Sequence, residues 1–259
     1  MSSLSDNIKL SQLGNTYLFF AGQTGFIIKS KNGQLFGYDL CLSDCVERLE
    51  GHVGFKRLLP PPFFPNELIF DCLVATHPHY DHFDIDAMPW LISNNHTKLF
   101  ASIDCEKEVK RLGISNKRIS YVKPNTFFNC SDFQRDFVDC DHGKGAPDAV
   151  GLVLTVDGKK IYFAGDTCFR RDIAQSIASK YKIDVLIAPI NGAFGNLNEE
   201  ECAELADIIK PGLTIPCHYG LFASHSGNVG SFYKIMTEKY PQNKFKLMAF
   251  EEKLILEKK

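Results

Sequence analysis

The segment His77-Pro-His-Tyr-Asp-His82 concentrates three histidines and one carboxylate within six residues. Imidazole nitrogens and carboxylate oxygens are the ligands that divalent transition metals prefer. The segment directly follows residues 72–76, a short apolar run that predicts a buried strand. A loop at a strand end can turn alternate side chains toward one point. This spacing favours a metal site over a solvent-exposed, histidine-rich loop.

Four ligand-type residues this close together cannot all bind one tetrahedral ion without strain, so the motif indicates either surplus ligands or two ions. Three further candidates, His142, Asp166 and His218, lie just past predicted strands or in glycine-flanked loops. Taken singly, they have ordinary roles as a surface-loop histidine, a turn or cap residue and a buried core histidine, respectively. Together they are more informative, because strands that end at one rim present their loops to a common site.

Three residues near His218 could bind the substrate or protonate its leaving group. Tyr219, His225 and Ser226 lie within eight residues of it, so any of them could reach the same pocket. Exposure to solvent in a loop is the ordinary alternative for all three side chains.

A phosphorylated substrate would need a cationic anchor, because a guanidinium group matches phosphate oxygens well. Arg170, four residues after Asp166, is the first candidate, and Arg171, Lys144 and Arg57 are others. Surface charge is the ordinary alternative for these residues.

The elements that must position these residues are strands alternating with helices. Strands are expected at residues 16–20, 25–29, 35–40, 72–76, 98–101, 150–156, 160–164, 184–188, 213–216, 246–250 and 253–257. Helices are expected at residues 84–93, 104–112, 171–181, 199–210 and 228–240. Asp157-Gly158 predicts a hairpin between two of the strands. Because no linker or repeat interrupts this pattern, we expect one mixed α/β (α+β) domain over residues 1–259, with helices outside its sheets.

The composition is that of an ordinary globular chain. The 259 residues are 44% hydrophobic and 23% charged, with a formal net charge of −2, which argues against a protein that mainly binds nucleic acid. The nine scattered cysteines form neither a zinc-finger nor a disulfide pattern, so we expect reduced thiols in a cytoplasmic protein. The sequence contains no signal peptide and no apolar run that could span a membrane, so we expect no membrane partner.

The motifs together resemble the metallo-β-lactamase fold superfamily, whose signature H-x-H-x-D-H is intact in residues 77–82. Several segments look most like the L-ascorbate-6-phosphate lactonase branch of metal-dependent hydrolases. These segments are Gly22-Gln-Thr-Gly25, Pro60-Pro-Pro62, Leu73-Val-Ala-Thr-His-Pro-His-Tyr-Asp-His82 and Pro216-Cys-His-Tyr-Gly220. The resemblance runs from about Gly22 to the C-terminus and implies a four-layer αββα sandwich.

The resemblance also implies a dinuclear site with zinc, manganese or iron. One ion would be held by His77, His79 and His142, and the other by Asp81, His82 and His218, with Asp166 between them. A hydroxide shared by the two ions would then be the nucleophile, because two cations lower the pKa of water toward neutrality. Asp81 and Asp166 would be the catalytic carboxylates, acting first as ligands and only second as bases.

Three functions remain open from the sequence. The first is a metal-dependent hydrolase that opens or cleaves a small lactone or ester, phosphorylated or not. The others are a phosphodiesterase or nuclease on the same fold and a metal-binding protein without turnover. The near-neutral charge disfavours the nuclease, and the complete ligand set disfavours the inactive protein. We expect a small-molecule substrate and no nucleic-acid partner; the sequence does not determine the oligomeric state.

Overall fold

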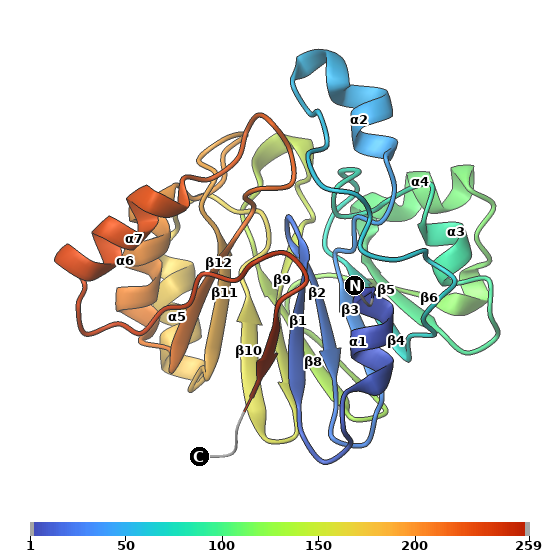
Figure 1. Cartoon of the computed structure of the whole chain (residues 1–259), viewed down its shortest axis with the longest axis horizontal. Coiled ribbons are helices and arrows are strands. Elements are labelled where there is room, and N and C mark those ends of the chain that lie inside the picture. Colours follow the sequence, from blue (N-terminus) through green and yellow to red (C-terminus); the bar gives the residue numbers. More distant parts are fainter. Residues whose placement is uncertain (1–2, 257–259) are drawn as a thin grey trace.

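The computed structural model describes residues 3–256 as two β-sheets that pack face to face, with helices on the outer sides (Figure 1). This arrangement confirms the predicted αββα fold class. Residues 1–2 and 257–259 of the predicted domain, and thus the end of the strand expected at 253–257, lie outside the described residues.

The first sheet has seven strands in the order β13-β1-β2-β3-β4-β5-β6. β13, β1, β2 and β3 pair antiparallel, and β3 to β6 pair parallel. In chain order the bounds are Tyr17–Gly22 (β1), Gly25–Lys29 (β2), Leu35–Tyr38 (β3), Cys72–Ala75 (β4), Lys98–Ser102 (β5), Ile119–Val122 (β6) and Lys253–Ile255 (β13).

The second sheet has six strands in the order β12-β11-β10-β9-β8-β7. β7 to β10 pair antiparallel, whereas β10, β11 and β12 pair parallel. The bounds are Thr126–Cys130 (β7), Phe133–Asp139 (β8), Val150–Val156 (β9), Lys159–Phe163 (β10), Val185–Pro189 (β11) and Leu213–Cys217 (β12).

Seven helices and four single 3₁₀ turns complete the described chain. The helices are Leu4–Leu10 (α1), Cys45–Glu50 (α2), Met88–Leu91 (α3), Glu106–Arg111 (α4), Arg171–Lys180 (α5), Glu199–Ile209 (α6) and Val229–Glu238 (α7). The 3₁₀ turns are Gly51–Val53 (η1), Ile103–Cys105 (η2), Asn116–Arg118 (η3) and Gly143–Gly145 (η4). α5, α6 and α7 pack on the second sheet, and α1, α3 and α4 pack on the first. Within residues 3–256, every helix is too short or too polar to traverse a lipid bilayer.

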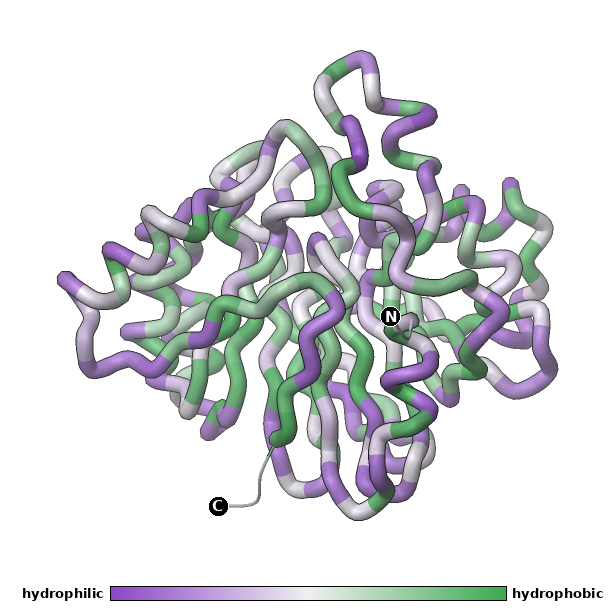
Figure 2. Tube along the Cα trace, viewed as in Figure 1, coloured by the Kyte–Doolittle hydropathy of each residue, from purple (hydrophilic) through white to green (hydrophobic). Residues whose placement is uncertain are grey.

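Strand β1 shows why both faces of the first sheet are apolar. Leu18 and Phe20 point into the core between the sheets, whereas Tyr17 and Phe19 pack toward the helices. Because successive side chains alternate between faces, a strand buried on both sides reads as a continuous apolar run. The strands at the centre of Figure 2 are largely apolar because they are buried on both faces.

Most predicted elements are present, with three differences. One prediction that holds is the hairpin: Asp157 and Gly158 both adopt positive φ and join β9 to β10. The differences are as follows. The helix expected at 84–93 is only the short α3, and the Asp84 carboxylate accepts hydrogen bonds from the amides of Asp86 and Ala87 in the turn before it. The strand expected at 246–250 is wrong: after one bridge at Phe245, the Met248 backbone bonds to a tyrosine hydroxyl instead of a strand. Elements α1, α2 and β6 to β8 were not predicted; β6 and β7 lie at sheet edges, where burial patterns are weak.

The strand directions bring seven loops to one edge of the sandwich. β1, β3 and β4 of the first sheet end at this edge, as do β8, β10, β11 and β12 of the second. Loops after parallel strands meet at a common rim, which is where such folds place their sites. The short helix α2 projects above this end of the molecule in Figure 1.

Candidate metal centre

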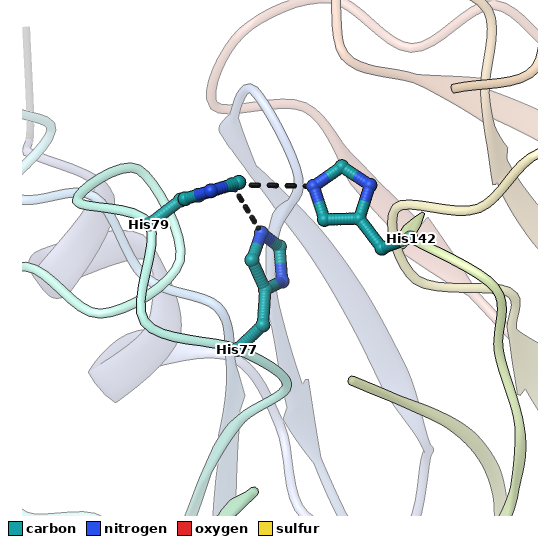
Figure 3. Close-up of side chains that lie close together, drawn as sticks. All are labelled: His77, His79 and His142. Carbon is teal, nitrogen blue, oxygen red and sulfur yellow. Dashed lines mark hydrogen bonds between the residues drawn. The ribbon is translucent and has the colours of Figure 1, made fainter. Parts of the chain in front are cut away.

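Three histidine rings from two loops converge on one point. His77 and His79 follow β4, and His142 follows β8 (Figure 3). His79 Nδ1 lies 2.9 Å from His77 Nε2 and 3.2 Å from His142 Nε2. The ligand atoms of this first triad lie within 4.8 Å of one another, close enough to bind a single ion.

A second triad lies beside the first and consists of Asp81, His82 and His218. The first two residues belong to the loop after β4, and His218 directly follows β12. Asp81 Oδ2 lies 3.6 Å from His82 Nε2 and 3.5 Å from His218 Nε2. The two sheets therefore each contribute ligands to both triads.

Asp166, in the loop after β10, lies between the triads. Its Oδ2 atom is 3.3 Å from the Nε2 atoms of His82 and His218 and 4.0 Å from Nε2 of His142. Asn196 donates a hydrogen bond from Nδ2 to the same oxygen at 2.7 Å. One carboxylate thus faces both groups, and an amide from the loop after β11 holds it in place.

Asp39 anchors parts of both triads from behind, although sequence reasoning missed it. His82 donates from Nδ1 to Asp39 Oδ2 at 2.8 Å, which directs its Nε2 atom into the cluster. The Thr76 hydroxyl donates to the same carboxylate at 2.7 Å and lies 3.1 Å from His77 Nδ1. Because this hydroxyl already donates to Asp39, it accepts the hydrogen of His77 Nδ1 and leaves Nε2 of His77 free.

Gln23, at the end of β1, supports the second triad. Its side-chain nitrogen donates to Asp81 Oδ2 at 3.0 Å and lies 3.0 Å from His218 Nδ1. The backbone supports the same contact, because the His218 amide donates to the Gln23 carbonyl at 2.7 Å. The signals for these missed residues were weak: Gln23 lies in the glycine-bounded segment 22–25, Asp39 lies inside the strand predicted at 35–40, and Asn196 had no distinguishing signal.

Burial and charge prepare the ligands for a cation. Burial lowers the pKa of His77, His79 and His142, so these rings are neutral and keep lone pairs for a metal at neutral pH. Burial alone would raise the pKa of Asp166, but His82 and His218 outweigh it and hold this pKa well below its usual value. The carboxylate therefore stays ionised.

The pKa of His82 moves in the opposite direction. Burial lowers it, but the nearby carboxylates of Asp166, Asp81 and Asp39 together raise it well above the usual histidine value. In the metal-free chain the proton on His82 offsets their negative charge. A cation would replace that proton.

The cluster fits divalent metal ions. Nε2 of His82 and Oδ1 of Asp166 are buried and have no hydrogen-bond partner among residues 3–256. Buried polar atoms are normally paired, so these two atoms indicate a missing partner. A mixed set of imidazole and carboxylate donors suits zinc, manganese and iron.

A cavity of about 330 Å³ opens over the cluster, and its walls include Glu50, Val53, Phe55 and Phe194. A second cavity of about 420 Å³ adjoins it and contains Lys144. His79, His142 and Phe194 line both. Both cavities are large enough for part of a small molecule.

The three predicted substrate-binding residues have different surroundings. The Tyr219 hydroxyl donates to the Met248 carbonyl at 2.6 Å, so it is engaged away from the cavity walls. Arg170 pairs with Asp141 at 2.7 Å and with Asp172. His225 does not line the cavity itself, but its ring packs 4.9 Å from that of Phe55, which does. Of the other cationic candidates, Arg57 and Arg171 are engaged within the protein.

The ligands of both triads lie within a segment that matches a known family. Residues 41–219 match the family model described as "Beta-lactamase superfamily domain". The "UPF0173 metal-dependent hydrolase" of Methanosphaera stadtmanae is 30% identical over 210 residues, which cover 71% of this chain and 88% of the relative. The protein of the same name from Polynucleobacter asymbioticus is 27% identical over 247 residues, covering 86% of this chain and 81% of the relative.

Solved structures agree on the fold. The metallo hydrolase Igni18 from Ignicoccus hospitalis has a TM-score of 0.72 at 20% identity, covering 95% of this chain and all of that one. The metallo-beta-lactamase fold protein YhfI from Bacillus subtilis has a TM-score of 0.68 at 13% identity, covering 93% and 99%. At these identities the likeness concerns the fold alone.

Proposed function

The chain belongs to the beta-lactamase superfamily, within its UPF0173 metal-dependent hydrolases, and from that premise we propose that it cleaves small esters or lactones with two divalent ions. The observation that carries this proposal is the pair of triads that share Asp166. A single ion would need only one of the two triads, so two triads on either side of the Asp166 carboxylate favour two ions.

In this proposal each ion has its own ligands. His77, His79 and His142 hold the first, whereas Asp81, His82 and His218 hold the second, and Asp166 faces both. When bound, two such cations lower the pKa of water and polarise the substrate oxygen. Zinc, manganese and iron all suit these donors.

The residues around the cluster keep its two carboxylates ionised and hold Asp166 in place. Asp166 is kept ionised by its histidine neighbours and is held by Asn196, so the negative charge between the ions has a fixed position. Burial also raises the pKa of Asp81, but His82 and His218 outweigh it and lower that pKa overall. Both carboxylates therefore serve as ligands first and as bases only second.

The cavity supports a small substrate rather than a polymer. Its described walls contain no lysine or arginine to neutralise a chain of phosphates, which disfavours a nuclease. Lys144, in the adjoining cavity, makes no ion pair within residues 3–256, whereas Arg57 and Arg170 are engaged within the protein. A phosphorylated lactone, as in the lactonase branch that the sequence resembles, would direct its phosphate toward Lys144.

Metal content and a substrate panel test this proposal. Protein purified without chelator and offered zinc, manganese and iron should hold two ions per chain by elemental analysis. The loaded protein should hydrolyse lactones or carboxylic esters in preference to phosphodiesters and thioesters. Trace metal only would contradict the dinuclear site, and turnover of phosphodiesters alone would contradict the substrate class.

A further inference from the structure

Three aromatic rings from three separate segments pack together beside the 330 Å³ cavity, and two of them, Phe55 and Phe194, line its wall. Phe55 follows η1, Phe194 lies in the loop between β11 and α6, and His225 lies between β12 and α7. The ring centroids of Phe55 and Phe194 are 6.0 Å apart with their planes at 24°, and His225 lies 4.8 Å from Phe194. We refer to these three residues as the aromatic mouth.

Phe194 does not behave as a core residue. It is 61% exposed, although a large apolar ring is normally buried in a folded protein. Its backbone has a φ of +55°, which is costly for a residue with a side chain. Hydrogen bonds hold this loop, from the Gly192 amide to the Leu197 carbonyl at 3.0 Å and from the Asn196 amide to the Ala193 carbonyl at 3.0 Å. Strain that the surrounding structure maintains at a cavity is typical of ligand-binding positions.

The same loop also contacts the centre of the metal cluster. Asn196, two residues after Phe194, donates to Asp166. The ring and the carboxylate are therefore held in a defined relation to each other. A group that stacks on Phe194 would have a fixed position relative to the reacting bond.

The chemistry of the cavity wall indicates what such a group is. Val53, Phe55 and Phe194 provide apolar surface beside the histidines and carboxylates of the cluster. Outside the cluster, the described wall carries two ionisable side chains, the carboxylate of Glu50 and the imidazole of His52. The described wall contains no lysine or arginine to pair with an anionic group, whereas a flat uncharged ring would find the rings of Phe55 and Phe194.

We infer that Phe55 and Phe194 are specificity-determining residues that receive an uncharged aromatic group attached to the scissile ester or lactone. This inference rests on the proposed function and names its substrate class: aryl esters and benzo-fused lactones. His225 packs against both phenylalanine rings and supports them from outside the cavity wall.

A matched pair of lactones tests the inference. Dihydrocoumarin and δ-valerolactone contain the same six-membered lactone, but only the first carries a fused benzene ring. In the metal-loaded full-length protein, Phe55→Ala and Phe194→Ala should each lower the ratio of kcat/KM for dihydrocoumarin over δ-valerolactone by about tenfold. Phe127→Ala, which removes a ring that is 53% exposed from the sheet-edge strand β7, is the control for Phe194→Ala and should leave the ratio unchanged. An unchanged ratio in both mouth variants would overturn the inference.

Product binding separates this inference from the proposed function. If the metal-loaded protein hydrolyses neither lactone, the hydrolase proposal is weakened, and titration calorimetry with the two ring-opened acids still tests the mouth. Wild-type protein should bind 3-(2-hydroxyphenyl)propanoate about tenfold more tightly than 5-hydroxypentanoate, and both mouth variants should lose that preference. Equal affinities in the wild type would overturn the inference. Circular dichroism of each variant ensures that a loss of preference does not reflect unfolding.

Discussion

The two triads share Asp166 but differ in what holds their side chains. In the second triad, His82 donates to Asp39, and Gln23 contacts both Asp81 and His218. In the first triad, His77 is held through Thr76, but among the described residues the His79 ring has hydrogen-bond partners only within the triad. Nδ1 of His142 is buried and has no partner within residues 3–256.

The difference follows from where each triad lies. Asp39 and Gln23 follow β3 and β1, so the first sheet supports the second triad from behind. His79 is the exposed member of the cluster, and with His142 it lines both cavities. Asp81 and His218 of the second triad line only the first of these cavities, so the triad with fewer internal restraints is the one that reaches both. The second triad should be the better-organised metal site, because outer hydrogen bonds orient its ligands before metal arrives.

The largest effect is expected from a substitution that removes the carboxylate shared by the two triads. Asp166→Ala should reduce kcat/KM by about 1,000-fold or more and lower the metal content below two ions per chain, because both sites lose the same carboxylate. Enzyme kinetics and elemental analysis on the same preparation check this. Asp184→Ala is the matched control, because Asp184 precedes β11 at the opposite edge of the sheet. Two retained ions would show that the triads do not depend on Asp166.

A smaller effect, expected from a substitution at Asp39, should differ between the two metal sites. Asp39→Asn removes the charged acceptor behind His82 and should weaken metal binding at the second site by about 10–100-fold, with a lesser effect at the first site through Thr76. Competition with a chelator of known affinity measures the two dissociation constants. Asp71→Asn, where the carboxylate accepts from Leu35 and His96 instead, should change neither constant. Equal weakening of both sites by Asp39→Asn would contradict the difference in support.

The smallest effect should come from Gln23. Asparagine tolerates the positive φ of +55° at this position but is too short to reach Asp81, so Gln23→Asn should weaken only the second site, by about fivefold. The same chelator competition measures it. Gln34→Asn serves as the control, because its amide oxygen accepts from the backbone of Asp132 instead of contacting the cluster. An effect as large as that of Asp39→Asn would show that the amide, not the buried carboxylate, organises the site.

Local sequence patterns predicted most of the fold. The Asp157-Gly158 hairpin and the strands around it were predictable because turn residues and alternating or continuous apolar runs act over a few residues. The segment at 246–250 has a similar apolar pattern, but the Tyr219 hydroxyl, 29 residues away in sequence, binds the Met248 backbone instead. No short-range pattern contains that contact.

By itself, the sequence determined which residue types can bind metal and that they follow predicted strand ends. Histidine and aspartate spacing is a property of the chain, so seven candidate ligands could be named from it. The family resemblance already implied how they divide into two triads, and the tertiary structure brings the ligand atoms of each triad within 4.8 Å of one another. Only the tertiary structure revealed that Asp39, Gln23 and Asn196 support them. It also placed Phe55 beside Phe194 at the cavity mouth. The physical reason is that these contacts join loops from seven strands in two sheets, and the direction and order of those strands bring the loops together.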